Sequence, residues 1–155
     1  MKKLAGFGLL LMLITSTVVA GNNKISVENG WVRAVPPVSK NTAAYFTLTN
    51  SMKQDDVLLY LSSDVAEHTE FHTIIEEPNG AKRMQKMPHA TIKAGQDLEL
   101  KPGGYHVMLI GLKQPLKKTD QVTIELLFQR AGKIKVTLPV KMAEPGDGDH
   151  HHHHH

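Results

Sequence analysis

The feature that most constrains the fold of this chain is a series of short β-branched and aromatic runs separated by turn residues. No convincing amphipathic helix follows residue 21, and the runs recur about every 8–15 residues, a spacing typical of β-sandwiches. The pattern predicts strands at 30–35, 43–49, 57–62, 69–76, 82–87, 97–101, 105–110, 122–128 and 133–139. We therefore expect an all-β domain folded as a Greek-key β-sandwich.

Alternation within these runs predicts which side chains face the core. Side chains two residues apart leave the same face of a strand, so a half-buried strand alternates apolar and polar residues. The clearest such set is Val122, Ile124, Leu126 and Phe128. The pair Pro36-Pro37 cannot donate ladder hydrogen bonds and therefore predicts the end of the first strand.

Both ends of the chain carry segments that we exclude from the fold. Residues 1–20 contain two lysines, an apolar run and a final Val-Val-Ala, which together predict a cleaved secretory signal peptide. The apolar run is shorter than the roughly 18–20 residues that a membrane span needs. Residues 144–155 form a tail that ends in a hexahistidine tag. We expect a periplasmic protein with one domain at 21–143 and no stable membrane insertion after cleavage.

Composition excludes several classes of function. Without Lys2 and Lys3 of the signal peptide the formal charge falls from +3 to +1, so there is no basic footprint for nucleic acid. The chain has no cysteine, which excludes disulfides and thiolate metal ligands. We also find no Ser-His-Asp order, paired carboxylate motif or phosphate loop, and we expect that the protein is not an enzyme.

A histidine and a methionine lie two residues apart in the apolar segment 105–110. In an extended strand His106 and Met108 leave the same face with their Cα atoms about 6.5–7 Å apart. Both side chains are long enough to reach one atom above the strand. This His-x-Met pair therefore predicts two ligands of one metal ion.

Other histidines and methionines lie nearby in the sequence. A turn at 78–80 would bring the preceding and following strands together, and with them His72, Met84, Met87 and His89. Neutral imidazole and thioether ligands favour copper(I) over zinc, magnesium or calcium. We interpret the neighbouring carboxylates as ordinary solvated charge; they are Glu67, Glu70, Glu76 and Glu77.

These residues resemble a known family, the periplasmic copper(I) chaperones called PCuAC. The family pattern is a histidine, ten residues, a methionine, twenty-one residues and then His-x-Met. Here twenty-one residues separate Met84 from His106, and residues 104–116 read GYHVMLIGLKQPL, close to the family's GYHxMLxGLxxPL segment. The resemblance extends over about residues 31–140 and includes the early segments WVRA and AAYF.

The resemblance implies a cupredoxin-like β-sandwich whose copper(I) ligands are His72, Met84, His106 and Met108. The chain departs from the pattern at one place, because eleven residues instead of ten separate His72 from Met84. We expect the additional residue in the turn at 78–80, since loops tolerate insertions. Met87 remains an alternative to Met84, and His68 and His89 remain possible contributors.

The resemblance also implies that copper is delivered and not used for catalysis. The expected partner is a copper acceptor protein, either cytochrome c oxidase subunit II at its CuA centre or another assembly factor, and the expected state is a monomer. Two alternatives stay open. One is a copper storage or import protein, and the other is a periplasmic immunoglobulin-like protein-interaction module.

Overall fold

The structure, a computed structural model, describes residues 24–143 and contains ten strands in that range. No helix long and apolar enough to cross a membrane occurs in these residues. The predicted signal peptide at 1–20 and the tail at 144–155 lie outside the described residues, so the domain boundaries stay predictions. The strands are β1 (Ile25–Arg33), β2 (Asn41–Asn50), β3 (Asp56–Ser62), β4 (Ala66–Glu76), β5 (Lys82–Lys86), β6 (Ala90–Ile92), β7 (Asp97–Glu99), β8 (His106–Leu112), β9 (Gln121–Phe128) and β10 (Gly132–Lys141).

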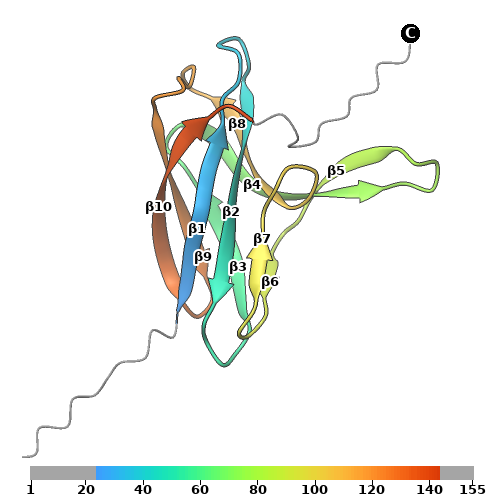
Figure 1. The fold of residues 1–155 in the computed structure, drawn as a ribbon, viewed down its shortest axis with the longest axis vertical. Coiled ribbons are helices and arrows are strands. Elements are labelled where there is room, and N and C mark those ends of the chain that lie inside the picture. The colour runs from blue at the N-terminus through green and yellow to red at the C-terminus, as the bar shows by residue number, and fades with distance from the viewer. Residues whose placement is uncertain (1–23, 144–155) are drawn as a thin grey trace, which may run out of the picture.

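The strands form two layers that are joined along one edge. Hydrogen-bonded neighbours follow the order β5-β4-β8-β2-β1-β10-β9-β3-β6, and β7 pairs with β2. The first layer, which we call the first sheet, runs from β5 to β1 and includes β7; the second sheet runs from β10 to β6 (Figure 1). The parallel pair of β1 and β10 joins them, with Val32 opposite Val140. The predicted all-β sandwich is confirmed.

The core lies between the inner faces of these two sheets. The predicted alternation in β9 is confirmed, because Val122, Ile124, Leu126 and Phe128 are all at most 2% exposed. From the first sheet, buried residues of β2 and β8 complete the core; they include Phe46, Leu48, Val107 and Leu109. Apolar burial of this kind contributes about 25 cal/mol for each Å² removed from water.

Several strand boundaries differ from those predicted. The three-residue strand β6 was not predicted, because it is too short to show alternation. β1 begins at Ile25 and not at residue 30. Its pairing with β2 is irregular between Glu28 and Trp31, where Asn29 has a φ of 54°, and the strand continues on both sides of this irregularity. The predicted end of this strand before Pro36 is confirmed.

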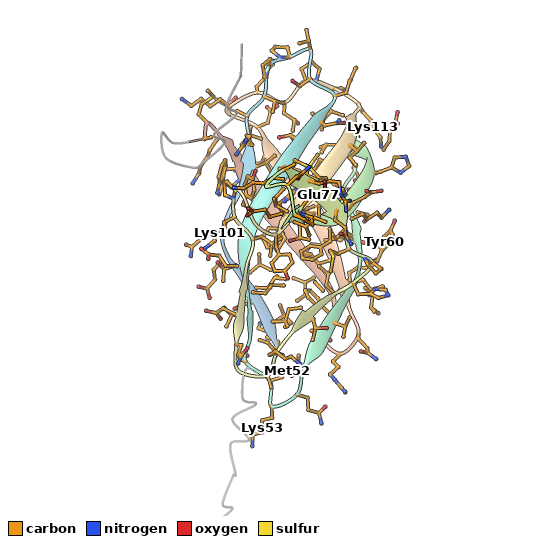
Figure 2. The ribbon with its side chains drawn as sticks, turned by 90° about the vertical axis from the view of Figure 1, so that its right-hand side faces the viewer. Met52, Lys53, Tyr60, Glu77, Lys101 and Lys113 are labelled. Atoms are coloured by element: carbon orange, nitrogen blue, oxygen red, sulfur yellow. The ribbon has the colours of Figure 1, made fainter. Side chains whose placement is uncertain are left out.

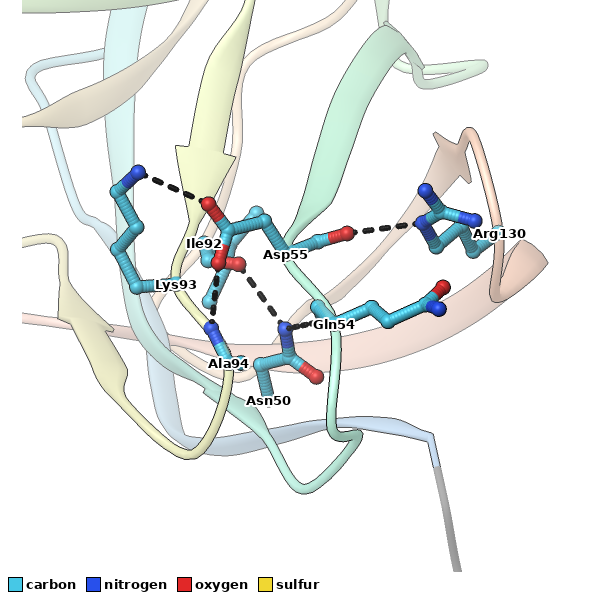
Figure 3. Close-up of polar contacts among 7 residues, drawn as sticks. All are labelled: Asn50, Gln54, Asp55, Ile92, Lys93, Ala94 and Arg130. Atoms are coloured by element: carbon cyan, nitrogen blue, oxygen red, sulfur yellow. Dashed lines mark hydrogen bonds and ion pairs between the residues drawn. The ribbon is translucent and has the colours of Figure 1, made fainter.

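A polar network closes the end of the sandwich where the loop after β2 meets the loop after β6 (Figure 3). The buried Asn50 donates through Nδ2 to the carbonyl oxygens of Gln54 and Ile92, each at 2.9 Å. Asp55 pairs with Lys93 at 2.8 Å. The two bonds from Asn50 give its buried amide acceptors from both loops and so join them.

The hairpin of β4 and β5 extends away from the body of the sandwich (Figure 1). All five residues of β5 are exposed, and β5 is the last strand at its edge of the sheet. In the turn, Glu77 donates its N–H to the carbonyl of Ala81 at 2.8 Å, and Gly80 supplies the left-handed conformation with a φ of 82°. Figure 2 looks toward this hairpin, with Glu77 near the centre of the view.

Candidate metal centre

Two of the predicted ligand residues face each other across neighbouring strands. His72 of β4 is directly opposite His106 of β8 in the antiparallel register. The centroids of the two imidazole rings are 5.8 Å apart. Residues opposite each other share one face of a sheet, so both rings leave the same face.

This shared face is the outer face of the first sheet. Phe71 and Val107, which are the next residues on the two strands, belong to the core and therefore point inward. Met108, two residues after His106, lies on the outer face opposite Glu70 and is half-buried. The predicted spacing thus places His72, His106 and Met108 on adjacent positions of two paired strands.

The register of the β4–β5 hairpin distinguishes the two candidate methionines, Met84 within β5 and Met87 directly after it. Met84 is opposite Ile74, two residues from His72, so it shares the outer face with both histidines. Met87 donates its N–H to Phe71 and packs against the core, so it lies on the other face. Met84 is 54% exposed, and β4 separates its strand from β8.

A hydrogen bond to an acceptor oxygen determines the tautomer of each neutral imidazole. His106, which is 4% exposed, donates through Nδ1 to the carbonyl of Gly104 at 2.9 Å, so the lone pair of the neutral ring is on Nε2. His72 donates through Nε2 to Glu70 at 2.9 Å, which leaves the lone pair on Nδ1. The Nδ1 atom is buried without a hydrogen-bond partner in the part of the chain that the structure describes.

Glu70 is a functional candidate that sequence reasoning missed. Its second oxygen accepts from Lys86 Nζ at 2.7 Å, and the hydrogen bonds from Lys86 and then His72 hold the pKa of Glu70 below its usual range. The interpretation of this carboxylate as ordinary solvated charge is therefore wrong. The available signal was its position two residues before His72, since that spacing puts both side chains on one face.

The other two histidines within residues 24–143 are both exposed. His68 is exposed on the outer face opposite Ile110, four residues or about 13 Å along β4 from His72. His89 is exposed in the segment between β5 and β6.

The donor set decides which ions the outer face suits. Within residues 24–143 no three His, Cys, Asp or Glu side chains cluster so as to hold a metal ion. A metal site at His72 and His106 would thus need a further ligand of another kind, and the thioether of Met108 lies on the same face. Imidazole and thioether together suit a soft monovalent ion.

The sequence and the fold both match known proteins. Residues 25–140 match the family described as "Putative lipoprotein LpqE-like". The protein named "Putative lipoprotein Lxx21020" from Leifsonia xyli subsp. xyli is 33% identical over 118 residues, which are 76% of this chain and 69% of that protein.

Two solved structures are similar to this chain in fold. The copper(I)-bound solution structure of DR1885 from Deinococcus radiodurans is 35% identical, covers 79% of this chain and 83% of its own, and superimposes with a TM-score of 0.61. The copper-bound PCuAC domain from PmoF2 is 21% identical, covers 77% of this chain and 94% of its own, and gives a TM-score of 0.66.

The fold is therefore the cupredoxin-like β-sandwich of PCuAC domains, as the resemblance predicted. The chain belongs to the LpqE-like family, which its match over most of the described residues establishes.

Proposed function

We propose that this protein is a periplasmic copper chaperone, which binds one copper(I) ion through His72, Met84, His106 and Met108 and passes it to an acceptor. The observation that carries the proposal is the pairing of His72 with His106 on the outer face, with ring centroids 5.8 Å apart. Copper(I) fits because all four ligands are neutral and two of them are soft. The buried Nδ1 of His72 would gain its partner from the ion.

The exposure of the four side chains suggests an order of release. Met84 is 54% exposed on the outermost strand, whereas His106 is 4% exposed in the middle of the sheet. An acceptor ligand reaches copper most easily from the Met84 side, so Met84 is replaced first and His106 last. Such stepwise exchange keeps the ion bound throughout the transfer, and it needs no catalytic residue.

The proposed acceptor is the CuA centre of cytochrome c oxidase or another factor of its assembly. Copper-bound structures of the related DR1885 and of a PmoF2 domain support copper as the cargo. The family pattern supports delivery, and the protein acts as a monomer in this proposal. A deletion strain grown at limiting copper tests the acceptor: loss of oxidase activity supports delivery, whereas normal oxidase activity with lowered total copper indicates storage or import.

The binding proposal is tested by a copper(I) competition titration against a chromophoric chelator. The protein must lack the hexahistidine tag, because the tag binds copper by itself. We expect one equivalent of copper(I) per chain. An absence of binding would favour a protein-interaction module instead.

A further inference from the structure

Glu70 lies in the middle of the proposed ligands without being one of them. It is two residues before His72 on β4 and directly opposite Met108 of β8. All three side chains therefore share the outer face of the first sheet.

Both carboxylate oxygens of Glu70 are occupied by donors. Oε2 accepts from His72 Nε2 at 2.9 Å, and Oε1 accepts from Lys86 Nζ at 2.7 Å. The side chains of Glu70 and His72 are 21% and 14% exposed, so their contact is mostly shielded from water. Lys86 lies on β5 directly opposite His72, so the carboxylate of Glu70 is held by a donor on each of its two oxygens.

This arrangement determines which nitrogen of His72 can bind a metal ion. A carboxylate only accepts hydrogen bonds, so its contact keeps the proton of the neutral ring on Nε2 and the lone pair on Nδ1. Carboxylates that hold the other ring nitrogen of a histidine ligand fix both its tautomer and its orientation.

We propose that Glu70 is a positioning residue of the copper site, which holds His72 as the Nε2–H tautomer with Nδ1 directed to the ion; this inference rests on the proposed function. Lys86 supports this role, because its ion pair with Glu70 holds the carboxylate in place and neutralises its charge. The Glu70–Lys86 pair therefore orients His72 without adding the net negative charge that attracts hard ions.

The second histidine provides an internal reference. His106 donates through Nδ1 to the backbone carbonyl of Gly104, a contact that does not involve Glu70. A substitution of Glu70 is thus expected to alter the tautomer of His72 and leave that of His106 unchanged.

The test is nitrogen NMR of the imidazole rings in metal-free, tag-free protein, followed by a copper(I) competition titration. In the wild type we expect His72 as a single Nε2–H tautomer. In Glu70→Ala we expect a mixture of the two tautomers at His72 and a copper(I) affinity about 10- to 100-fold lower. Glu70→Gln keeps an oxygen acceptor, and we expect it to restore the tautomer and most of the affinity.

The matched control is Glu125→Ala. Glu125 also accepts from two lysines, Lys133 and Lys135, but it lies on β9 and forms no ion pair with a histidine of residues 24–143. We expect this variant to keep both tautomers and the affinity of the wild type.

The two proposals fail in different ways. An unchanged His72 tautomer and an unchanged affinity in Glu70→Ala would overturn the positioning role. The proposed function fails separately, if the wild-type protein binds no copper(I) in the titration. The tautomer of His72 is measured without copper, so that result does not depend on copper binding.

Discussion

His72 and His106 are directly opposed residues of two neighbouring antiparallel strands, β4 and β8, with their ring centroids 5.8 Å apart. The backbone register fixes this relationship, so neither ring depends on a loop for its place in the sheet. Strand positions give a site more precise geometry than loop positions do. The two histidines therefore form the rigid part of the candidate site, whereas Met84 is on the exposed hairpin strand.

Removal of a ligand from β8 should abolish tight copper binding. We expect His106→Ala and Met108→Ala each to lower copper(I) affinity by more than about 100-fold, because loss of a ligand exceeds the effect of losing its supporting hydrogen bond. The competition titration measures this. The matched controls are His68→Ala and His89→Ala, which remove exposed histidines that are not among the four proposed ligands. Equal losses in all four variants would contradict the assignment.

Substitutions of the two candidate methionines should separate binding from stability. We expect Met84→Ala to weaken copper(I) binding about 10-fold or more while leaving the free energy of unfolding nearly unchanged, since this side chain is 54% exposed. Met87 packs against the core, so Met87→Ala should lower the free energy of unfolding by about 1–2 kcal/mol and retain the affinity. Copper titration and urea unfolding together check both expectations. The reverse pattern would make Met87 the ligand.

The buried carboxylate of Asp56 should be important for folding. Asp56 is 0% exposed and accepts from the backbone N–H groups of Val57, Arg130 and Ala131 at 2.8–2.9 Å. Asp56→Ala leaves these donors without an acceptor, so we expect the free energy of unfolding to fall by about 3 kcal/mol in urea titrations. The exposed Asp97→Ala is the control, with an expected change below about 0.5 kcal/mol. A similarly small change in Asp56→Ala would show that water replaces the lost bonds.

Asp55 should contribute to the loss of stability in acid. Its bond to Lys93, followed by that from the N–H of Ala94, lowers the pKa of Asp55 from its ordinary value in the folded protein. A lowered pKa stabilises the fold above the unfolded-state pKa of about 3.9, and that stabilisation is lost as the pH falls through the folded-state value.

We therefore expect the difference in unfolding free energy between wild type and Asp55→Asn to shrink as the pH falls from about 6 to about 2. Urea unfolding at a series of pH values measures this difference. Lys93→Met removes the main cause of the shift, so the same comparison made in the Lys93→Met background should depend less on pH. A difference that stays constant across this range would contradict the role of Asp55.

The parts of the fold that were predictable are those with a repeating pattern. The alternation of β9 identified its core face, and the two-residue spacing of His106 and Met108 put them on one face. β6 has only three residues and is recognisable only from its pairing with β3.

The choice between Met84 and Met87 depended on the hairpin register, which sequence spacing did not specify. The register runs without a bulge from His72 opposite Lys86 to Glu76 opposite Lys82. The turn between β4 and β5 is thus the place where the chain can gain a residue without shifting the pairing of the two strands. The position of Glu70 two residues before His72 indicated a shared face, but the hydrogen bond between the two side chains depends on how they are oriented, which the sequence does not specify.

The contact between Trp31 and Tyr45 gives the molecule an optical reporter of its own. Trp31 is the single tryptophan of the chain, and its ring centroid is 4.8 Å from that of Tyr45 on the strand next to β8. Its fluorescence therefore arises from the sheet that carries the histidines and not from the opposite layer. Changes in that sheet can be followed by emission without a label.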